Sequence, residues 1–143
     1  MIYWALLLHF YQPPTQSLDV LHRVVEESYR PLLNVLGQHP HARVTANFAG
    51  VLTEMLSQGG FADVVTGFRK LAQMGQVELT GSAKYHAILP LVPRQEALRQ
   101  IRLNAATNRR YFGRAYHPRG LFPPELALST EALEPILQAG HQW

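Results

Sequence analysis

The sequence predicts an α/β fold in which parallel strands are joined by crossover helices. Short apolar segments alternate along the chain with longer segments whose apolar residues recur at helical spacing. This strand–helix alternation occurs four times, and a fifth strand then begins. Such an alternation is typical of a parallel sheet, because parallel neighbours need long crossover connections. At 143 residues the chain is expected to form one domain, residues 1–143.

The expected strands are short and hydrophobic. They comprise residues 2–8, 42–48, 76–80 and 119–122, with the fifth strand beginning at 141–143. The first run is continuously apolar, which indicates a strand buried on both faces of a sheet. Pro13 and Pro14 follow it, and because proline cannot extend a ladder they place the residues before them in a loop.

The expected helices carry one apolar face each. They comprise residues 18–36, 51–56, 61–74, 95–112 and 131–139. Val64, Val65, Phe68 and Leu71 show the helical spacing most clearly. Serines at the starts of the first and last helices are N-cap candidates, and glycines mark most helix ends. Pro31 is expected to break or restart the first helix.

Composition excludes several classes of protein. The chain is 47% hydrophobic and 16% charged, which indicates a globular protein, and its lack of cysteine rules out disulfides and thiolate chemistry. The net charge of +3 reflects arginines between residues 94 and 119, which lack the interleaved aromatic residues of a nucleic-acid surface. The first apolar run is too short to cross a bilayer and lacks the features of a signal peptide. We therefore expect a cytoplasmic protein without nucleic-acid or membrane partners.

Polar side chains follow or end the predicted strands. In chain order they are His9, Tyr11, Gln12, Asn47, Glu78, Lys84, His86 and Glu125. In a barrel of alternating strands and helices these ends point to one face, where active sites lie. This mixture suits a sugar ligand, because polar groups can hydrogen-bond its hydroxyls and aromatic rings can cover the apolar face of a pyranose. His39 and His41 flank a proline in a turn and are interpreted as surface residues, because a metal needs further ligands.

Glu125 is the candidate catalytic residue. Leu121 and Phe122 are expected to end a buried strand, and Pro123 and Pro124 then fix a rigid turn before the carboxylate. On this segment alone, a solvated carboxylate near a helix start is an equal alternative, because the helix dipole favours a negative charge there. A glycine-rich phosphate loop and a nucleophile elbow are both absent from the sequence.

Three motifs in order resemble those of glycoside hydrolase family 57, the α-amylases, 4-α-glucanotransferases and branching enzymes that act on α-glucans. Residues 9–13 (His-Phe-Tyr-Gln-Pro) resemble the family's His-x-His-Gln-Pro, and residues 75–79 (Gly-Gln-Val-Glu-Leu) match its second motif. Residues 121–125 (Leu-Phe-Pro-Pro-Glu) stand where the family has Trp-Leu-Thr/Pro-Glu. The resemblance covers essentially the whole chain. Tyr11 in place of histidine, and the altered third motif, indicate a divergent branch.

The resemblance implies that this chain is the N-terminal part of a (β/α)7 TIM-like barrel, truncated at its C-terminal side. It implies a retaining mechanism in which Glu125 attacks the anomeric carbon and forms a glycosyl-enzyme intermediate. His9, Tyr11, Gln12, Asn47 and Glu78 would then contact an oligo- or polysaccharide, and no cofactor or metal is required. Lys84 and His86 are added as substrate-binding residues from their loop position.

The family's fourth motif, which supplies an acid/base aspartate, is not found. The aspartates are Asp19 and Asp63, and both fall on predicted helices. We therefore expect the chain to be a fragment without turnover, with Glu78 as a less favoured substitute for the acid/base. The alternatives are a metal-dependent polysaccharide deacetylase that uses His9 and His86, a non-catalytic α-glucan-binding pseudoenzyme, and a core fragment that needs a C-terminal partner to fold.

Overall fold

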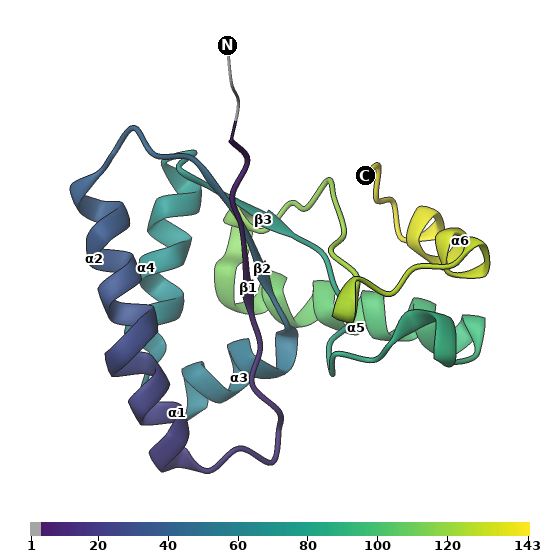
Figure 1. Ribbon diagram of the computed structural model, residues 1–143, viewed down its shortest axis with the longest axis horizontal. Helices are drawn as coiled ribbons and strands as arrows, with labels where there is room; N and C mark the ends of the chain where they lie inside the picture. The colour runs from purple at the N-terminus through teal and green to yellow at the C-terminus, as the bar shows by residue number, and fades with distance from the viewer. Residues whose placement is uncertain (1–3) are drawn as a thin grey trace.

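The computed structural model describes residues 4–143 and confirms an α/β fold built on a parallel sheet (Figure 1). Its strands are β1 (Leu7–Phe10), β2 (Val44–Phe48) and β3 (Val77–Thr80), arranged in the order β1-β2-β3. His9 lies opposite Asn47, and Asn47 lies opposite Thr80. Because residues in register share a face of the sheet, these three side chains lie side by side at the carboxyl ends of the strands.

The predicted helices are confirmed, with boundaries shifted by at most two residues. They are α1 (Leu18–Val24), the π-helical turn η1 (Val25–Tyr29), α2 (Arg30–Gln38), α3 (Gly50–Gln58), α4 (Ala62–Gln73), α5 (Arg94–Phe112) and α6 (Thr130–Gln138). Three 3-10 turns complete the set: η2 (Leu89–Leu91), η3 (Gly113–Ala115) and η4 (Pro124–Leu126). The backbone amide of Ala132 donates to the Ser129 hydroxyl, which confirms that predicted cap.

Pro31 does not break the first helix. The chain stays helical from α1 through η1 into α2, where Pro31 occupies the first turn. The turn before the proline is widened to a π-helix. Proline has no amide hydrogen and its ring clashes with the carbonyl four residues earlier, so a wider turn relieves both problems without ending the helix.

Three of the predicted strands differ from the structure. β1 begins at Leu7 and includes His9, whereas the prediction of 2–8 began at residues that lie outside the described part of the chain. The predicted strand at 119–122 is reduced to one parallel bridge between Leu121 and Gly81. Residues 141–143 are not a strand, although the Leu121 amide donates to the Trp143 carbonyl at 2.7 Å. The prolines that follow Phe122 cannot donate to a ladder, so pairing stops there.

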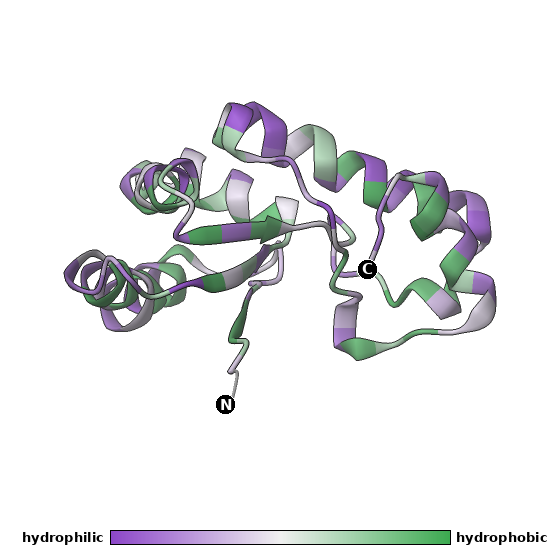
Figure 2. Ribbon diagram, turned by 90° about the horizontal axis from the view of Figure 1, so that it is seen from above, coloured by the Kyte–Doolittle hydropathy of each residue, from purple (hydrophilic) through white to green (hydrophobic). Residues whose placement is uncertain are grey.

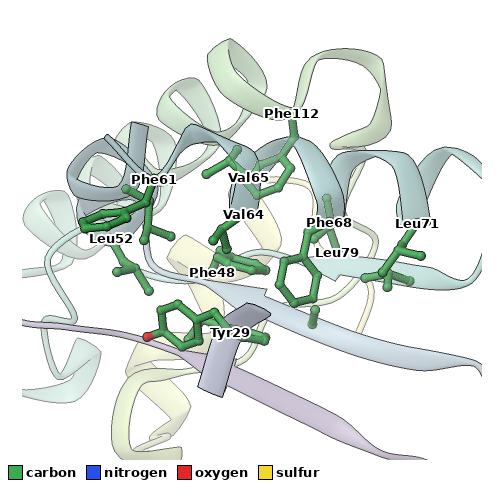
Figure 3. Close-up of a cluster of buried hydrophobic side chains, with 14 of the residues drawn as sticks. Tyr29, Phe48, Leu52, Phe61, Val64, Val65, Phe68, Leu71, Leu79 and Phe112 are labelled. Atoms are coloured by element: carbon green, nitrogen blue, oxygen red, sulfur yellow. The ribbon is translucent and has the colours of Figure 1, made fainter. Parts of the chain in front are cut away.

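The core lies between the sheet and the helices. Phe10 and Phe48 stack with ring centroids 4.2 Å apart, and Phe68 and Phe112 lie 5.0 and 5.3 Å from Phe48. Figure 3 shows Phe48 and Phe68 within this cluster, with Phe112 above them. A second, smaller cluster around Ile101 joins α5 to α6 and to the bridge residue Leu121.

Helices from the two ends of the chain lie on opposite sides of the strands (Figure 1). Figure 1 shows α2 and α4 together on one side of the strands, whereas α6 and the C-terminus lie on the other side. Figure 2 shows helices that alternate hydrophilic and hydrophobic residues, as expected for elements that bury one face. None of the helices within residues 4–143 is long and apolar enough to cross a membrane.

Gly81 is predicted to be essential for docking the Leu121 segment. Its amide donates to the Gly120 carbonyl at 2.8 Å, and an added Cβ would lie 2.4 Å from Cε1 of His141. Gly81→Ala is therefore expected to lower the free energy of unfolding by about 1–3 kcal/mol, the usual cost of overpacking. Urea denaturation measures this change.

Gly37→Ala is the matched control. Gly37 lies within α2, and an added Cβ would meet nothing within 4 Å. The substitution is expected to raise the free energy of unfolding by about 0.5–1 kcal/mol, because alanine loses less backbone freedom than glycine in a helix. Equal effects of the two substitutions would contradict the proposed close contact at Gly81.

Candidate active site

A chain of side-chain hydrogen bonds crosses the carboxyl ends of the three strands. The Asn47 Nδ2 group donates to the Thr80 hydroxyl at 3.1 Å and to the Gly81 carbonyl at 3.0 Å. Asn47 Oδ1 lies 2.7 Å from His9 Nδ1, and His9 Nε2 lies 2.9 Å from Nε2 of His86. Residues from β1, β2 and the loop after β3 therefore form one connected polar network.

Glu125 lies at the open end of this network. Its Oε1 is 3.6 Å from Nδ1 of His86, and its side chain is 66% exposed, whereas that of His86 is only 8% exposed. The carboxylate is therefore accessible to a ligand, while the imidazole beside it is held in place by its surroundings.

Backbone strain is concentrated at these same residues. Within the described chain, the non-glycine residues with positive φ are His86 (58°), Glu125 (57°) and Leu126 (55°). This left-handed conformation costs about 1–3 kcal/mol at each ordinary residue and persists only where the surrounding structure enforces it. Such residues cluster at active sites, so the strain supports the choice of Glu125 and His86 as functional residues.

Aromatic rings border the network. The Tyr11 ring stacks on His86 with centroids 4.0 Å apart and planes 11° from parallel. The Phe122 ring lies 5.3 Å from that of His9. The site therefore combines a carboxylate and two imidazoles with apolar ring surfaces, which is the composition that sugar recognition requires.

The two imidazoles and the carboxylate influence one another electrostatically. Burial lowers the pKa of His86 below its ordinary value of 6.5, and the neighbouring His9 lowers it further. The Glu125 carboxylate acts in the opposite direction and raises the pKa of His86. The unprotonated form of His86 is therefore favoured near neutral pH.

Lys84 does not join this network. Its ammonium forms an ion pair with Glu54 of α3 at 2.8 Å, and its Cγ packs close to Gly50. The loop position that predicted a substrate-binding role is correct, but the side chain turns toward α3, where a carboxylate is available to pair with its buried charge.

Glu78 and Gln12 occupy the margins of the site. Glu78 is exposed rather than buried, and it precedes Thr80 by two residues in β3, so it lies on the same face of the sheet, toward the amino ends of the strands. Burial raises the pKa of the Tyr29 hydroxyl, and the Gln12 side chain opposes this with a smaller lowering effect.

Thr80 and Gly81 are site residues that the sequence did not single out. Thr80 is fully buried and accepts a hydrogen bond from Asn47. A threonine at the end of a strand is common enough to carry no functional signal, because β-branched residues favour strands. The one indication of a functional role in the sequence is that Thr80 directly precedes Gly81, where the polar loop 81–86 begins.

The fold and the site indicate a class of protein before any comparison. The parallel α/β sheet carries an exposed carboxylate and two imidazoles at the carboxyl ends of its strands, which is where barrel enzymes have their active sites. Among the described residues, no group of three or more His, Asp or Glu side chains is placed to hold a metal ion. This arrangement does not favour the deacetylase alternative.

Comparison with known families identifies the chain further. Residues 7–143 match the model of glycosyl hydrolase family 57, and the chain belongs to that family. It is 29% identical over 136 residues to an alpha-amylase of Pyrococcus horikoshii, an alignment that covers 95% of this chain and 21% of the relative. The chain thus spans about a fifth of the length of the curated relatives it matches.

Solved structures agree with this assignment. The 4-alpha-glucanotransferase of Thermococcus litoralis superposes with a TM-score of 0.88 at 25% identity, covering 96% of this chain and 21% of that one. The alpha-amylase AmyC of Thermotoga maritima has a TM-score of 0.84 at 18% identity, covering 96% and 38% of the two chains. The second likeness concerns the fold alone. Together they confirm that the chain has the fold of the N-terminal portion of the family's barrel.

The site predicts how stability depends on pH. Burial lowers the pKa of both His86 and His141 below 6.5, so near that pH the unfolded chain binds more protons than the folded one. The free energy of unfolding is therefore expected to fall as the pH is lowered from about 7.5 to about 5. Asp63, whose pKa is lowered by its hydrogen bond from Arg30, acts in the same direction only near and below its ordinary value of 3.8.

Urea denaturation at several pH values measures this dependence. His141→Gln is expected to reduce the slope of stability against pH, because it removes one of the two histidines responsible. His39→Gln, at an exposed histidine of the turn before β2, is the control and should leave the slope unchanged. A stability that does not vary across this pH range would contradict the burial of both imidazoles.

Proposed function

We propose that residues 1–143 form the N-terminal part of the catalytic barrel of a retaining enzyme that hydrolyses or transfers α-glucans, with Glu125 as its nucleophile. One observation carries this proposal. Leu121 is bridged to Gly81 at the end of β3, and two prolines then hold Glu125 exposed beside His86 at the carboxyl ends of the strands. That is where barrel enzymes place catalytic groups. The relatives named alpha-amylase and 4-alpha-glucanotransferase support an α-glucan as substrate.

The proposed reaction has two steps. The Glu125 carboxylate attacks the anomeric carbon, and the bond to the leaving oxygen breaks as a second carboxyl group protonates that oxygen. Water or an acceptor hydroxyl then attacks the glycosyl-enzyme ester, and the second group removes a proton from it. Two displacements retain the configuration, and this chemistry requires carboxyl groups about 5–5.5 Å apart.

The described residues do not offer an aspartate as this second group. Asp63 of α4 is paired with Arg30, and Asp19 lies in the first turn of α1. We propose that the acid/base lies outside residues 1–143, so that this chain alone binds sugar without turnover. Glu78 is the less favoured substitute, because it faces the same side of the sheet but lies toward the amino ends of the strands.

The sugar contacts are proposed to come from the residues of the network and its margins that remain at least partly exposed. These residues are His9, Tyr11, Gln12, Glu78 and His86. Asn47 is fully buried and acts by holding His9, and Lys84 is committed to Glu54.

A mechanism-based inhibitor tests the nucleophile. In the protein encoded by the full reading frame, a 2-deoxy-2-fluoroglucosyl fluoride is expected to label Glu125, which peptide mass spectrometry identifies. Glu125→Ala should lower kcat by about 10⁴-fold or more, as the loss of a covalent nucleophile does in other enzymes. Circular dichroism should be unchanged, because the side chain is exposed.

Glu27→Ala is the matched control, since Glu27 is an exposed carboxylate on η1. Its activity and labelling should equal those of the wild type. A label on any other residue, or normal turnover by Glu125→Ala, would refute the assignment of the nucleophile.

A further inference from the structure

We propose that His86 is a positioning residue for Glu125, and that Asn47 and His9 determine which nitrogen of His86 carries a proton toward the carboxylate. This inference rests on the proposed function of Glu125 and assigns a role to the residues behind it. The inference follows from which atoms can donate and which can accept a hydrogen bond along the series of side chains Asn47, His9, His86 and Glu125.

The orientation of the Asn47 amide is fixed by its partners. Its Nδ2 group lies 3.0 Å from the Gly81 carbonyl, which can only accept, and 3.1 Å from the Thr80 hydroxyl. The Oδ1 atom therefore faces His9, and an amide oxygen can only accept a hydrogen bond. It follows that His9 Nδ1 carries a hydrogen.

Because His9 carries its hydrogen on Nδ1, the contact between the two imidazoles also determines the tautomer of His86. When His9 is neutral, its Nε2 is an acceptor, so Nε2 of His86 must donate across the 2.9 Å contact. With both rings neutral, the Nδ1 atom of His86 is therefore unprotonated where it faces Glu125.

Adding one proton to the histidine pair changes the group that faces Glu125. If the proton is on His86, its Nδ1 becomes N–H. If the proton is on His9 instead, Nε2 of His9 donates to Nε2 of His86, and the remaining hydrogen of His86 is again on Nδ1. Both distributions present an Nδ1–H to the Glu125 carboxylate, whose Oε1 is 3.6 Å away. A second proton would place two donors face to face at Nε2 and break the contact.

The surroundings keep the His86 ring in this orientation. The side chain is 8% exposed, and Tyr11 stacks on its face. The titratable and charged groups that face the ring are His9 from β1, Tyr11 from the following loop and Glu125. The nearby Lys84 ammonium is paired with Glu54.

This geometry gives the histidine pair a defined task. When the histidine pair binds one proton, the Nδ1–H of His86 faces Oε1 of the Glu125 carboxylate. This N–H can then donate to Oε1 and orient the carboxylate for attack. The 3.6 Å separation needs to shorten by only a few tenths of an ångström to become a hydrogen bond, as catalytic contacts commonly do when substrate binds.

Nuclear magnetic resonance of the 143-residue chain tests the inference without any substrate. Long-range ¹H–¹⁵N spectra assign the tautomer of each histidine as the pH is lowered. Near neutral pH we expect hydrogens on Nδ1 of His9 and on Nε2 of His86, and at lower pH a new hydrogen on Nδ1 of His86. Detection of neutral His86 as the Nδ1–H tautomer, or as a mixture, would overturn the inference.

Two variants test the links on either side of His86. Glu125→Gln removes the carboxylate that favours protonation, so the pKa of His86 should fall, whereas the control Glu27→Gln should leave it unchanged. His9→Phe, at an exposed ring, removes the acceptor for Nε2, so neutral His86 should become a mixture of tautomers and its pKa should rise. If neither the tautomer nor the pKa of His86 changed in the two variants, the proposed coupling of His86 to His9 and Glu125 would be refuted. The signals of His39 serve as the internal reference.

The two proposals fail separately. If the fluorosugar labels another residue while the tautomers are as expected, the hydrogen-bond chain stands but Glu125 is not the nucleophile. If Glu125 is labelled while His86 carries the wrong tautomer, the function stands and the positioning role is wrong.

Discussion

The buried amide of Asn47 is the interaction on which the rest of the site depends. Its side chain is inaccessible to solvent, yet its oxygen and nitrogen together make three hydrogen bonds, to His9, Thr80 and Gly81. An unsatisfied buried polar group costs about 1–3 kcal/mol, so these contacts strongly favour one register of the strand ends. The same amide therefore aligns the three strands and orients the first imidazole of the site.

The strained segment that carries Glu125 is held from two sides. The Ser82 hydroxyl donates to the Phe122 carbonyl at 3.0 Å, and the Phe122 amide donates to the Gly81 carbonyl at 3.0 Å. Leu121 is buried in the cluster beneath α5 and α6. This support offsets the cost of the positive φ angles that follow, so Glu125 is held near His86 by backbone structure, with little contribution from side-chain packing of its own.

Much of the fold follows from the sequence, because periodicity and turn residues report on local structure. The helices, the three parallel strands and the Ser129 cap were predictable in this way. The direction of the Lys84 side chain was not, because it depends on Glu54, thirty residues earlier in the chain. The reduction of the fourth strand to a single bridge also depends on distant partners. The positions of His9, Asn47 and Glu125 were predictable, whereas the order in which they hydrogen-bond required the register between strands.

Side chains alternate between the two faces of a strand, so the core residues and the residues of the candidate site lie on opposite faces of the sheet. One face packs into the core through Phe10, Ala46, Phe48, Val77 and Leu79. The other face presents a second set, namely His9, Thr45, Asn47, Glu78 and Thr80. Tyr11 and the Phe-Pro-Pro segment, where the chain departs from the family's motifs, both lie in loops beyond this core. Substitutions there would change the shape of the proposed sugar site without opening a cavity among the packed phenylalanines. A chain with this division can diverge in specificity while it keeps the fold of its relatives, which accounts for close structural agreement at 25% sequence identity.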